Sequence, residues 1–302
     1  MIYAISGASG HIGRRIAEIL LEKRKNVRVI GRNADNLRSL TTLGAEAFVG
    51  SLEDTAFLAG AFDKVGAVFA MIPPSPKTED FRAFQNRVGA FIVSAIEKTG
   101  VRWVVNLSSQ GANLAEGTGP IAGLYDQEQR LNAIKGVHVV HLRPTLFMEY
   151  VMMNMDLFRS QNINGTPMKS DFVFPLIATR DIAAVAADYL LDLKFTGKSV
   201  RDLLGERDLS MNEITKILGR AIGNPELTYV QFPYDAAEKA MVGMGLSQNM
   251  AGLYIEMYRA FNEGRLLSGL RRSAENTTAT SFATFAQDFA AAYNKQKKDE
   301  SR

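Results

Sequence analysis

The feature that most constrains this chain is a glycine-rich turn near its N-terminus, between an apolar strand pattern and a helix pattern. Its glycines are spaced as Gly-x-x-Gly-x-x-Gly. In such a unit the first glycine allows a sharp turn, the second leaves room for a pyrophosphate, and the third lets the helix pack closely on the strand. The helix N-terminus then offers N–H groups to phosphate oxygens. The alternative is a glycine turn that binds nothing. The turn predicts a dinucleotide site made by Gly7, Ser9, Gly10, His11, Ile12 and Gly13.

Strand and helix patterns alternate through the first half of the chain. This alternation predicts an α/β fold of the Rossmann type, in which a doubly wound parallel sheet is covered by helices on both faces. Ligands of such folds bind at the carboxyl ends of the strands. The predicted strands are residues 2–6, 27–30, 47–49, 67–71, 103–107 and 138–143, and the predicted helices start near Gly13, Asn33, Asp54, Phe81 and Tyr125.

The pattern changes after Arg143, where methionine and aromatic residues become frequent and several shorter segments follow. We predict an NAD(P)-binding domain over residues 1–150, to which residues 177–204 return. A smaller α/β C-terminal lobe for the substrate is predicted over 151–176 and 205–302. Inside that lobe, Ser210 and Glu213 have the spacing of a capping box at the start of a helix.

The residues after the second predicted strand favour NADP(H) over NAD(H). An NAD site usually places an acidic residue there to hold the ribose 2′-hydroxyl. This chain has Arg32 at that point and no acidic residue before Asp35. A guanidinium can bind a 2′-phosphate with two hydrogen bonds, whereas a carboxylate would repel it. Arg14 or Arg38 could assist, and the alternative is that Arg32 is only a solvated loop residue.

The loops after the other strands supply the remaining candidate residues. The predicted cofactor contacts there are Ile72, Pro73, Leu107, Ser108 and Pro144. The predicted acceptor pocket is shaped by Ser109, Tyr125, Phe147, Met148 and Tyr150. Methionines can line a pliable apolar pocket, but on a helix they can equally belong to the core.

With these segments in place, the whole chain resembles the NmrA-like family of atypical short-chain dehydrogenase/reductases. The resemblance rests on the glycine turn, on Arg32, and on residues 142–144, 147–149, 179–183 and 205–214, and it extends to about residue 291. It implies a Rossmann-type domain, a small substrate lobe and NADP(H) binding. Members of the family include quinone and phenylpropanoid reductases, and also NADP(H)-sensing regulators with no obvious catalytic activity.

The resemblance also locates the catalytic candidates. Conventional members use Tyr-x-x-x-Lys, in which the lysine lowers the pKa of the tyrosine so that it can donate a proton. Here Tyr125 is followed by Gln129 at the lysine position, and Ser108 or Ser109 stands where the family has its serine. Tyr125 and Ser108 are therefore the catalytic candidates, in an incomplete set. Hydride transfer to a quinone needs no such donor, since the cofactor carries the difficult chemistry.

Two functions remain open at this point. The first is an NADPH-dependent oxidoreductase that acts on a small apolar carbonyl or quinone acceptor. The alternative is a non-catalytic NADP(H)-sensing regulator that acts through a protein partner.

Composition limits the partners and the location. The net charge is only +3 and no helix-turn-helix or basic stripe stands out, so we expect no nucleic-acid partner. No apolar run approaches the roughly 20 residues of a membrane helix, so we expect no membrane partner. The chain has no cysteine and no cluster with metal-ligand spacing, which predicts no metal site and fits a reducing cytoplasm. A cytoplasmic monomer or homodimer is expected.

Overall fold

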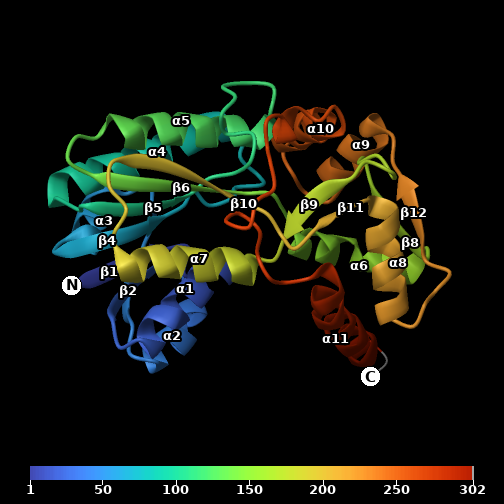
Figure 1. Cartoon of the computed structure of the whole chain (residues 1–302), viewed down its shortest axis with the longest axis horizontal. Helices are drawn as coiled ribbons and strands as arrows, with labels where there is room; N and C mark the ends of the chain where they lie inside the picture. Colours follow the sequence, from blue (N-terminus) through green and yellow to red (C-terminus); the bar gives the residue numbers. More distant parts are fainter. Residues whose placement is uncertain (301–302) are drawn as a thin grey trace.

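A seven-stranded parallel sheet forms the larger part of the molecule in the computed structural model (Figure 1). The structure describes the backbone of residues 1–300 and the side chains of residues 1–295, so the last two residues of the predicted lobe lie outside the described residues. The spatial order is β3-β2-β1-β4-β5-β6-β10, which confirms the predicted Rossmann-type α/β fold. Its strands are β1 (Ile2–Ser6), β2 (Asn26–Gly31), β3 (Glu46–Val49), β4 (Val65–Ala70), β5 (Trp103–Leu107), β6 (His138–Pro144) and β10 (Lys198–Leu203).

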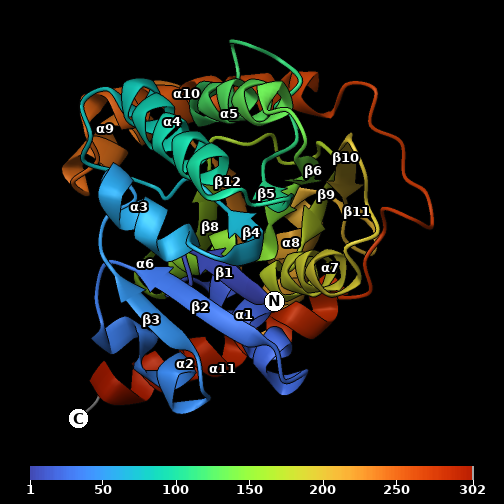
Figure 2. The same cartoon turned by 90° about the vertical axis from the view of Figure 1, so that its left-hand side faces the viewer.

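Helices cover both faces of this sheet (Figures 1 and 2). One face packs against α1 (His11–Glu22), α2 (Arg38–Thr42) and α7 (Thr179–Asp192), and the other against α3 (Thr55–Phe62), α4 (Phe81–Thr99) and α5 (Ala122–Ala133). Alternate residues of each strand serve the two cores, as a pleated strand requires. Val105 packs toward α1 and α7, and its neighbour Val104 packs toward α4.

The order of the strands reverses between β1 and β4, which defines the crevice where ligands of such sheets bind. One helix start differs from the sequence prediction. The helix expected near Asn33 is a short 3-10 turn, Asp35–Leu37, followed by the five-residue α2. Helix α7 begins at Thr179, directly after strand β9 (Phe174–Ile177).

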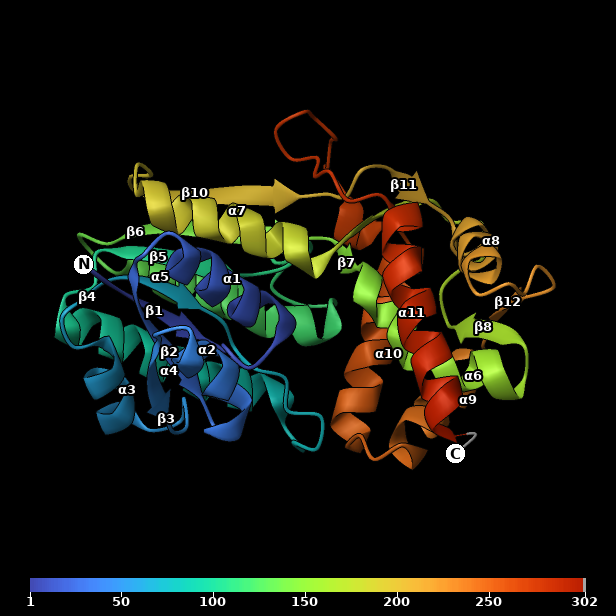
Figure 3. The same cartoon turned by 90° about the horizontal axis from the view of Figure 1, so that it is seen from below.

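The rest of the chain forms a second group of elements beside the carboxyl ends of the sheet strands (Figure 3). It has two small sheets, of order β11-β9-β7 and β12-β8, and a core rich in phenylalanine. Its strands are β7 (Leu146–Phe147), β8 (Ile163–Thr166), β9, β11 (Asp208–Leu209) and β12 (Thr228–Gln231). Its helices are the 3-10 helix η3 (Met148–Asn154), α6 (Met155–Ser160), α8 (Met211–Ala221), α9 (Tyr234–Gly243), α10 (Gln248–Asn262), the 3-10 helix η4 (Arg265–Leu267) and α11 (Phe282–Glu300).

Local sequence explains several of these boundaries. The capping box at the start of α8 is confirmed: the Glu213 N–H donates to the Ser210 hydroxyl, and the Ser210 N–H donates to the Glu213 carboxylate. Between β9 and β11 the chain leaves the second group of elements and returns to the main sheet, where β10 pairs in parallel with β6. The division of the chain at residue 150 stays a prediction.

The N-terminal end of α10 holds the loop after β4 in place. The Ser247 N–H donates to the Pro76 carbonyl at 2.9 Å, and the Ser247 hydroxyl donates to the Thr78 carbonyl at 2.6 Å. The Phe81 N–H donates to Asn249 Oδ1 at 3.0 Å. Segments far apart in sequence therefore form one wall beside the sheet crevice. No helix in the described part of the chain is both long and apolar enough to cross a membrane.

Candidate functional site

The glycine turn has the geometry that a phosphate-binding loop needs. Gly7 has φ +66°, in the left-handed region that favours glycine. A Cβ on Gly13 would lie 2.5 Å from the Gly7 carbonyl oxygen, so only glycine lets α1 approach the end of β1. Ser9, Gly10 and His11 are exposed at the turn, whereas Ile12 is buried beneath it.

The start of α1 leaves its N–H groups available to an anion. Gly10 is the N-cap and offers no side-chain hydrogen bond, and the first turn of the helix holds no acidic residue. The uncapped N–H groups and the helix dipole both favour a negatively charged ligand. The turn lies at the end of β1, at the reversal of strand order, so all six predicted loop residues come to the sheet crevice.

Three arginines lie near the ends of β1 and β2, and they differ in whether their guanidinium groups already have partners within the protein. Arg14 donates to the Ser39 hydroxyl at 3.0 Å and to a backbone carbonyl, and Arg38 pairs with Asp35 at 2.5 Å. Arg32 is exposed and has no hydrogen bond or ion pair with any described residue. Arg32 is therefore the arginine whose guanidinium can take a new anionic partner.

Ser108 lies at the end of β5 and is held by a buried ion pair. Its hydroxyl donates to Glu128 Oε1 at 2.5 Å. Arg143 donates to the same carboxylate through Nε at 2.9 Å and Nη2 at 2.5 Å. Burial opposes the charge of Arg143, but the hydrogen bonds and charge of Glu128 raise its pKa overall. Because the Ser108 hydroxyl already donates its one hydrogen bond to Glu128, it can interact with a ligand only by accepting a hydrogen bond.

Ser109 and Tyr125 are less constrained. Ser109 is half-buried and donates to its neighbour's carbonyl at 3.1 Å. Tyr125 is half-buried on α5, and its hydroxyl has no hydrogen bond with any described residue. Gln129 is exposed, so the residue at the position of the conventional lysine lies at the surface, and no hydrogen bond joins Tyr125 to a described lysine.

The other predicted strand-end residues divide between the crevice and the cores. Ile72 and Pro73 are half-buried in the loop after β4, beside the reversal of strand order. Leu107 is half-buried and packs on the α1 side of the sheet, and Pro144 is buried at the end of β6. Ile72 also packs against the core of the α4 side.

The predicted acceptor residues after β6 have different surroundings. Phe147 and Tyr150 stack with ring centres 5.7 Å apart and an angle of 16° between the rings. Tyr150 is 41% exposed, whereas Met148 is only 2% exposed and packs in the phenylalanine-rich core. Two tyrosines of α10, Tyr254 and Tyr258, also face this junction and were missed by sequence reasoning. Their spacing of four residues in a helical pattern is the signal that could have found them.

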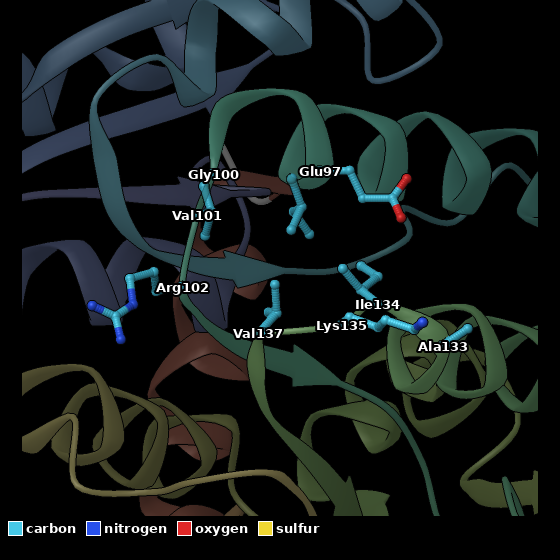
Figure 4. Close-up of a pocket in the computed structure, with 10 residues that line it drawn as sticks. Glu97, Gly100, Val101, Arg102, Ala133, Ile134, Lys135 and Val137 are labelled. Carbon is cyan, nitrogen blue, oxygen red and sulfur yellow. The ribbon is translucent and has the colours of Figure 1, made fainter.

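A separate hollow of about 510 Å³ lies far from this edge (Figure 4). It is bordered by the end of α4, the end of α5 and the segments before β5 and β6. The side chains of Arg102 and Lys135 point away from each other there (Figure 4). The hollow opens at the amino ends of the strands, opposite the glycine turn, and its charged groups do not converge on one ligand.

Known proteins resemble this chain along most of its length. The model of the NmrA-like family matches residues 2–286. The chain belongs to the NmrA-like family. The NAD(P)H azoreductase of Xenophilus azovorans is 27% identical over 299 residues, which cover 96% of this chain and 98% of the azoreductase.

Solved structures show the same fold. The triphenylmethane reductase of Citrobacter sp. has a TM-score of 0.80 at 19% identity, covering 97% of this chain and 100% of that one. An NADPH-dependent quinone oxidoreductase of Escherichia coli, complexed with NADPH, has a TM-score of 0.78 at 18% identity, covering 96% of this chain and 99% of that one.

Proposed function

We propose that this chain is an NADPH-dependent oxidoreductase that reduces a small apolar carbonyl or quinone acceptor. The observation that carries the proposal is the glycine turn at the reversal of strand order, with an unpaired Arg32 at the end of β2. The similar proteins give support: an NAD(P)H azoreductase, a triphenylmethane reductase solved in complex with NADP(H), and an NADPH-dependent quinone oxidoreductase. The acceptor classes in these three names are all conjugated.

Each part of the crevice has a role in this proposal. The turn from Gly7 to Gly13 binds the pyrophosphate, and Arg32 binds the 2′-phosphate. The nicotinamide lies near Ile72, Pro73, Leu107 and Pro144. Bound NADPH supplies a hydride there. The apolar lining of these loops excludes water from the transferred group.

Protonation of the product differs between acceptors. Ser108 is committed to Glu128 as a donor, so in this proposal it orients a ligand by accepting a hydrogen bond. Tyr125 remains the candidate proton donor for a carbonyl acceptor, since its hydroxyl is unpaired among the described residues. A quinone accepts its proton from solvent, and its reduction needs neither residue as an acid.

The partner in this proposal is a small-molecule acceptor, with no nucleic acid or membrane involved, and the protein acts in the cytoplasm as a monomer or homodimer. A non-catalytic NADP(H) sensor is the second candidate. The exposed Gln129, which leaves Tyr125 without a cation, favours it. The two functions differ in turnover and agree in cofactor binding.

The test measures NADPH and NADH binding by calorimetry and NADPH oxidation with a naphthoquinone. Arg32→Ser should weaken NADPH binding about 10- to 100-fold, because it removes a charge-assisted contact worth about 1.5–3 kcal/mol, and should leave NADH binding within about twofold. Arg15→Ser is the matched control, because Arg15 pairs with Glu18 and Glu22 on the solvent side of α1. Unchanged NADPH affinity in Arg32→Ser would refute the cofactor assignment. Tight NADPH binding without turnover on any quinone or carbonyl would favour the sensor.

A further inference from the structure

Three tyrosines lie on the 3-10 helix after β7 and on α10, a helix of the second group of elements that lies beside the carboxyl ends of the main sheet (Figure 3). Tyr150 comes from η3, and Tyr254 and Tyr258 lie one turn apart on the same side of α10. The three phenols are close enough to influence one another electrostatically. Tyr254 packs against the core of the α4 side and Tyr258 against the phenylalanine-rich core. The group thus spans the junction between the two parts of the molecule.

The three phenols are desolvated but remain accessible. Burial raises the pKa of Tyr150, Tyr254 and Tyr258. Each of these side chains nevertheless keeps exposed surface. A ligand could therefore contact all three rings from the outside of the junction.

Their hydroxyl groups are also unused. None of the three forms a hydrogen bond with any residue that the structure describes. The contrast with two other tyrosines is clear: the Tyr229 hydroxyl donates to the Met168 carbonyl at 2.6 Å, and the Tyr234 hydroxyl accepts from the Asn262 amide at 2.7 Å. None of the three hydroxyls is among the buried side-chain polar atoms without a partner in the described part of the chain, so each can be reached from outside and is available to a ligand that supplies an acceptor.

We propose that Tyr150, Tyr254 and Tyr258 form the specificity pocket for the acceptor: a flat, uncharged conjugated ring lies against Tyr150 and Phe147, and its carbonyl oxygens accept hydrogen bonds from Tyr254 and Tyr258. This inference rests on the proposed function, and it names the residues that select the substrate class. A neutral phenol donates to a carbonyl oxygen, and its ring provides apolar surface to a conjugated ligand. The pocket therefore favours quinones over simple aliphatic carbonyls.

The tyrosine hydroxyls can form hydrogen bonds with both the quinone substrate and the hydroquinone product. A quinone that gains the hydride of NADPH and one proton from solvent becomes a hydroquinone, and the cofactor becomes NADP⁺. The quinone oxygens only accept hydrogen bonds, whereas the hydroquinone oxygens can also donate. A tyrosine hydroxyl can turn from donor to acceptor without losing its proton. The three tyrosines are thus positioning residues whose phenols stay protonated throughout.

The test is binding of a naphthoquinone to the full-length protein saturated with NADP⁺, which prevents turnover. Tyr254→Phe and Tyr258→Phe should each weaken naphthoquinone binding about 3- to 10-fold, the value of one neutral hydrogen bond. NADP⁺ binding should stay unchanged in both variants. Naphthalene, which has no carbonyl group, should bind the variants and the wild type equally. Tyr189→Phe is the matched control, because Tyr189 lies on α7 against Phe195, away from the junction.

Two outcomes would overturn the proposal: equal naphthoquinone affinity in the wild type and both α10 variants, or a parallel loss for naphthalene. Failure of the proposed function is distinguishable from both. In that case the wild type shows no NADPH oxidation, while the binding comparison still reports on the tyrosines. Circular dichroism melting of the three Tyr→Phe variants excludes misfolding as the cause of any loss.

Discussion

Mild acid should destabilise this protein through His141, which is 1% exposed between β5, β6 and α5. Its Nδ1 pairs with the Asn106 amide nitrogen at 3.1 Å, and its Nε2 pairs with Asn132 Oδ1 at 3.0 Å. These partners assign Nδ1 as acceptor and Nε2 as donor, which is the pattern of a neutral ring. A proton on Nδ1 would set two donors against each other. Burial accordingly lowers the pKa of His141 from its ordinary 6.5 to about 4.

The sign and size of the effect follow from the two pKa values. The unfolded chain binds a proton at His141 below pH 6.5, whereas the folded chain does so only near pH 4. The stabilisation is therefore complete above pH 6.5 and is lost as the pH falls toward 4. The gap corresponds to about 3 kcal/mol in total, of which about 2 kcal/mol is lost between pH 7 and pH 5.

Urea unfolding at pH 7 and pH 5 measures this loss. His141→Gln removes the titrating ring, so the variant should begin less stable but lose about 2 kcal/mol less than the wild type between the two pH values. His11→Gln is the control, because His11 is exposed in the glycine turn, and it should keep the pH dependence of the wild type. If His141→Gln loses as much free energy as the wild type over this range, the reasoning about the buried ring is wrong.

Two further substitutions probe the crevice. Gly13→Ala places a Cβ against the Gly7 carbonyl, so it should cost about 1–3 kcal/mol of stability and weaken NADPH binding, measured by urea unfolding and calorimetry. An unshifted NADPH Kd would contradict the close-approach role of that glycine. Glu128→Gln leaves the half-buried Arg143 without its charge partner and should cost about 3 kcal/mol in urea unfolding. Glu22→Gln, in an exposed pair, should stay within about 0.5 kcal/mol, and equal losses would refute the importance of burial.

The sequence predicted best what local chemistry determines. The run from residue 2 to Gly13 contains strand, turn and helix start within one short segment, so its geometry needs no distant partner. The capping box of Ser210 and Glu213 is local for the same reason. The central strands β1, β2, β4, β5 and β6 were also predicted, because they are buried and nearly continuous apolar runs.

The site depended on contacts that no local pattern encodes. The partner of Ser108 is Glu128, twenty residues away on α5, and the pair forms only when that helix packs over β5. Tyr254 and Tyr258 reach the junction because α10 folds back toward the sheet, which their surrounding sequence does not specify. Two-residue strands such as β7 and β11 are likewise products of pairing and carry no periodicity of their own.

The late return of the chain to its main sheet has a consequence for its biosynthesis. Strands β1 to β6 leave the ribosome before α7, whose Ile182, Ala183 and Leu190 complete one core, and before β10, which covers the edge of β6. A nascent chain ending near residue 150 therefore exposes an apolar sheet face and an unpaired strand edge, a condition that invites aggregation. The loop after β4 lacks its hydrogen-bond partner for longer still, until Ser247 has been synthesised. Slow translation between these points should make the protein depend on chaperones, although its finished fold is compact.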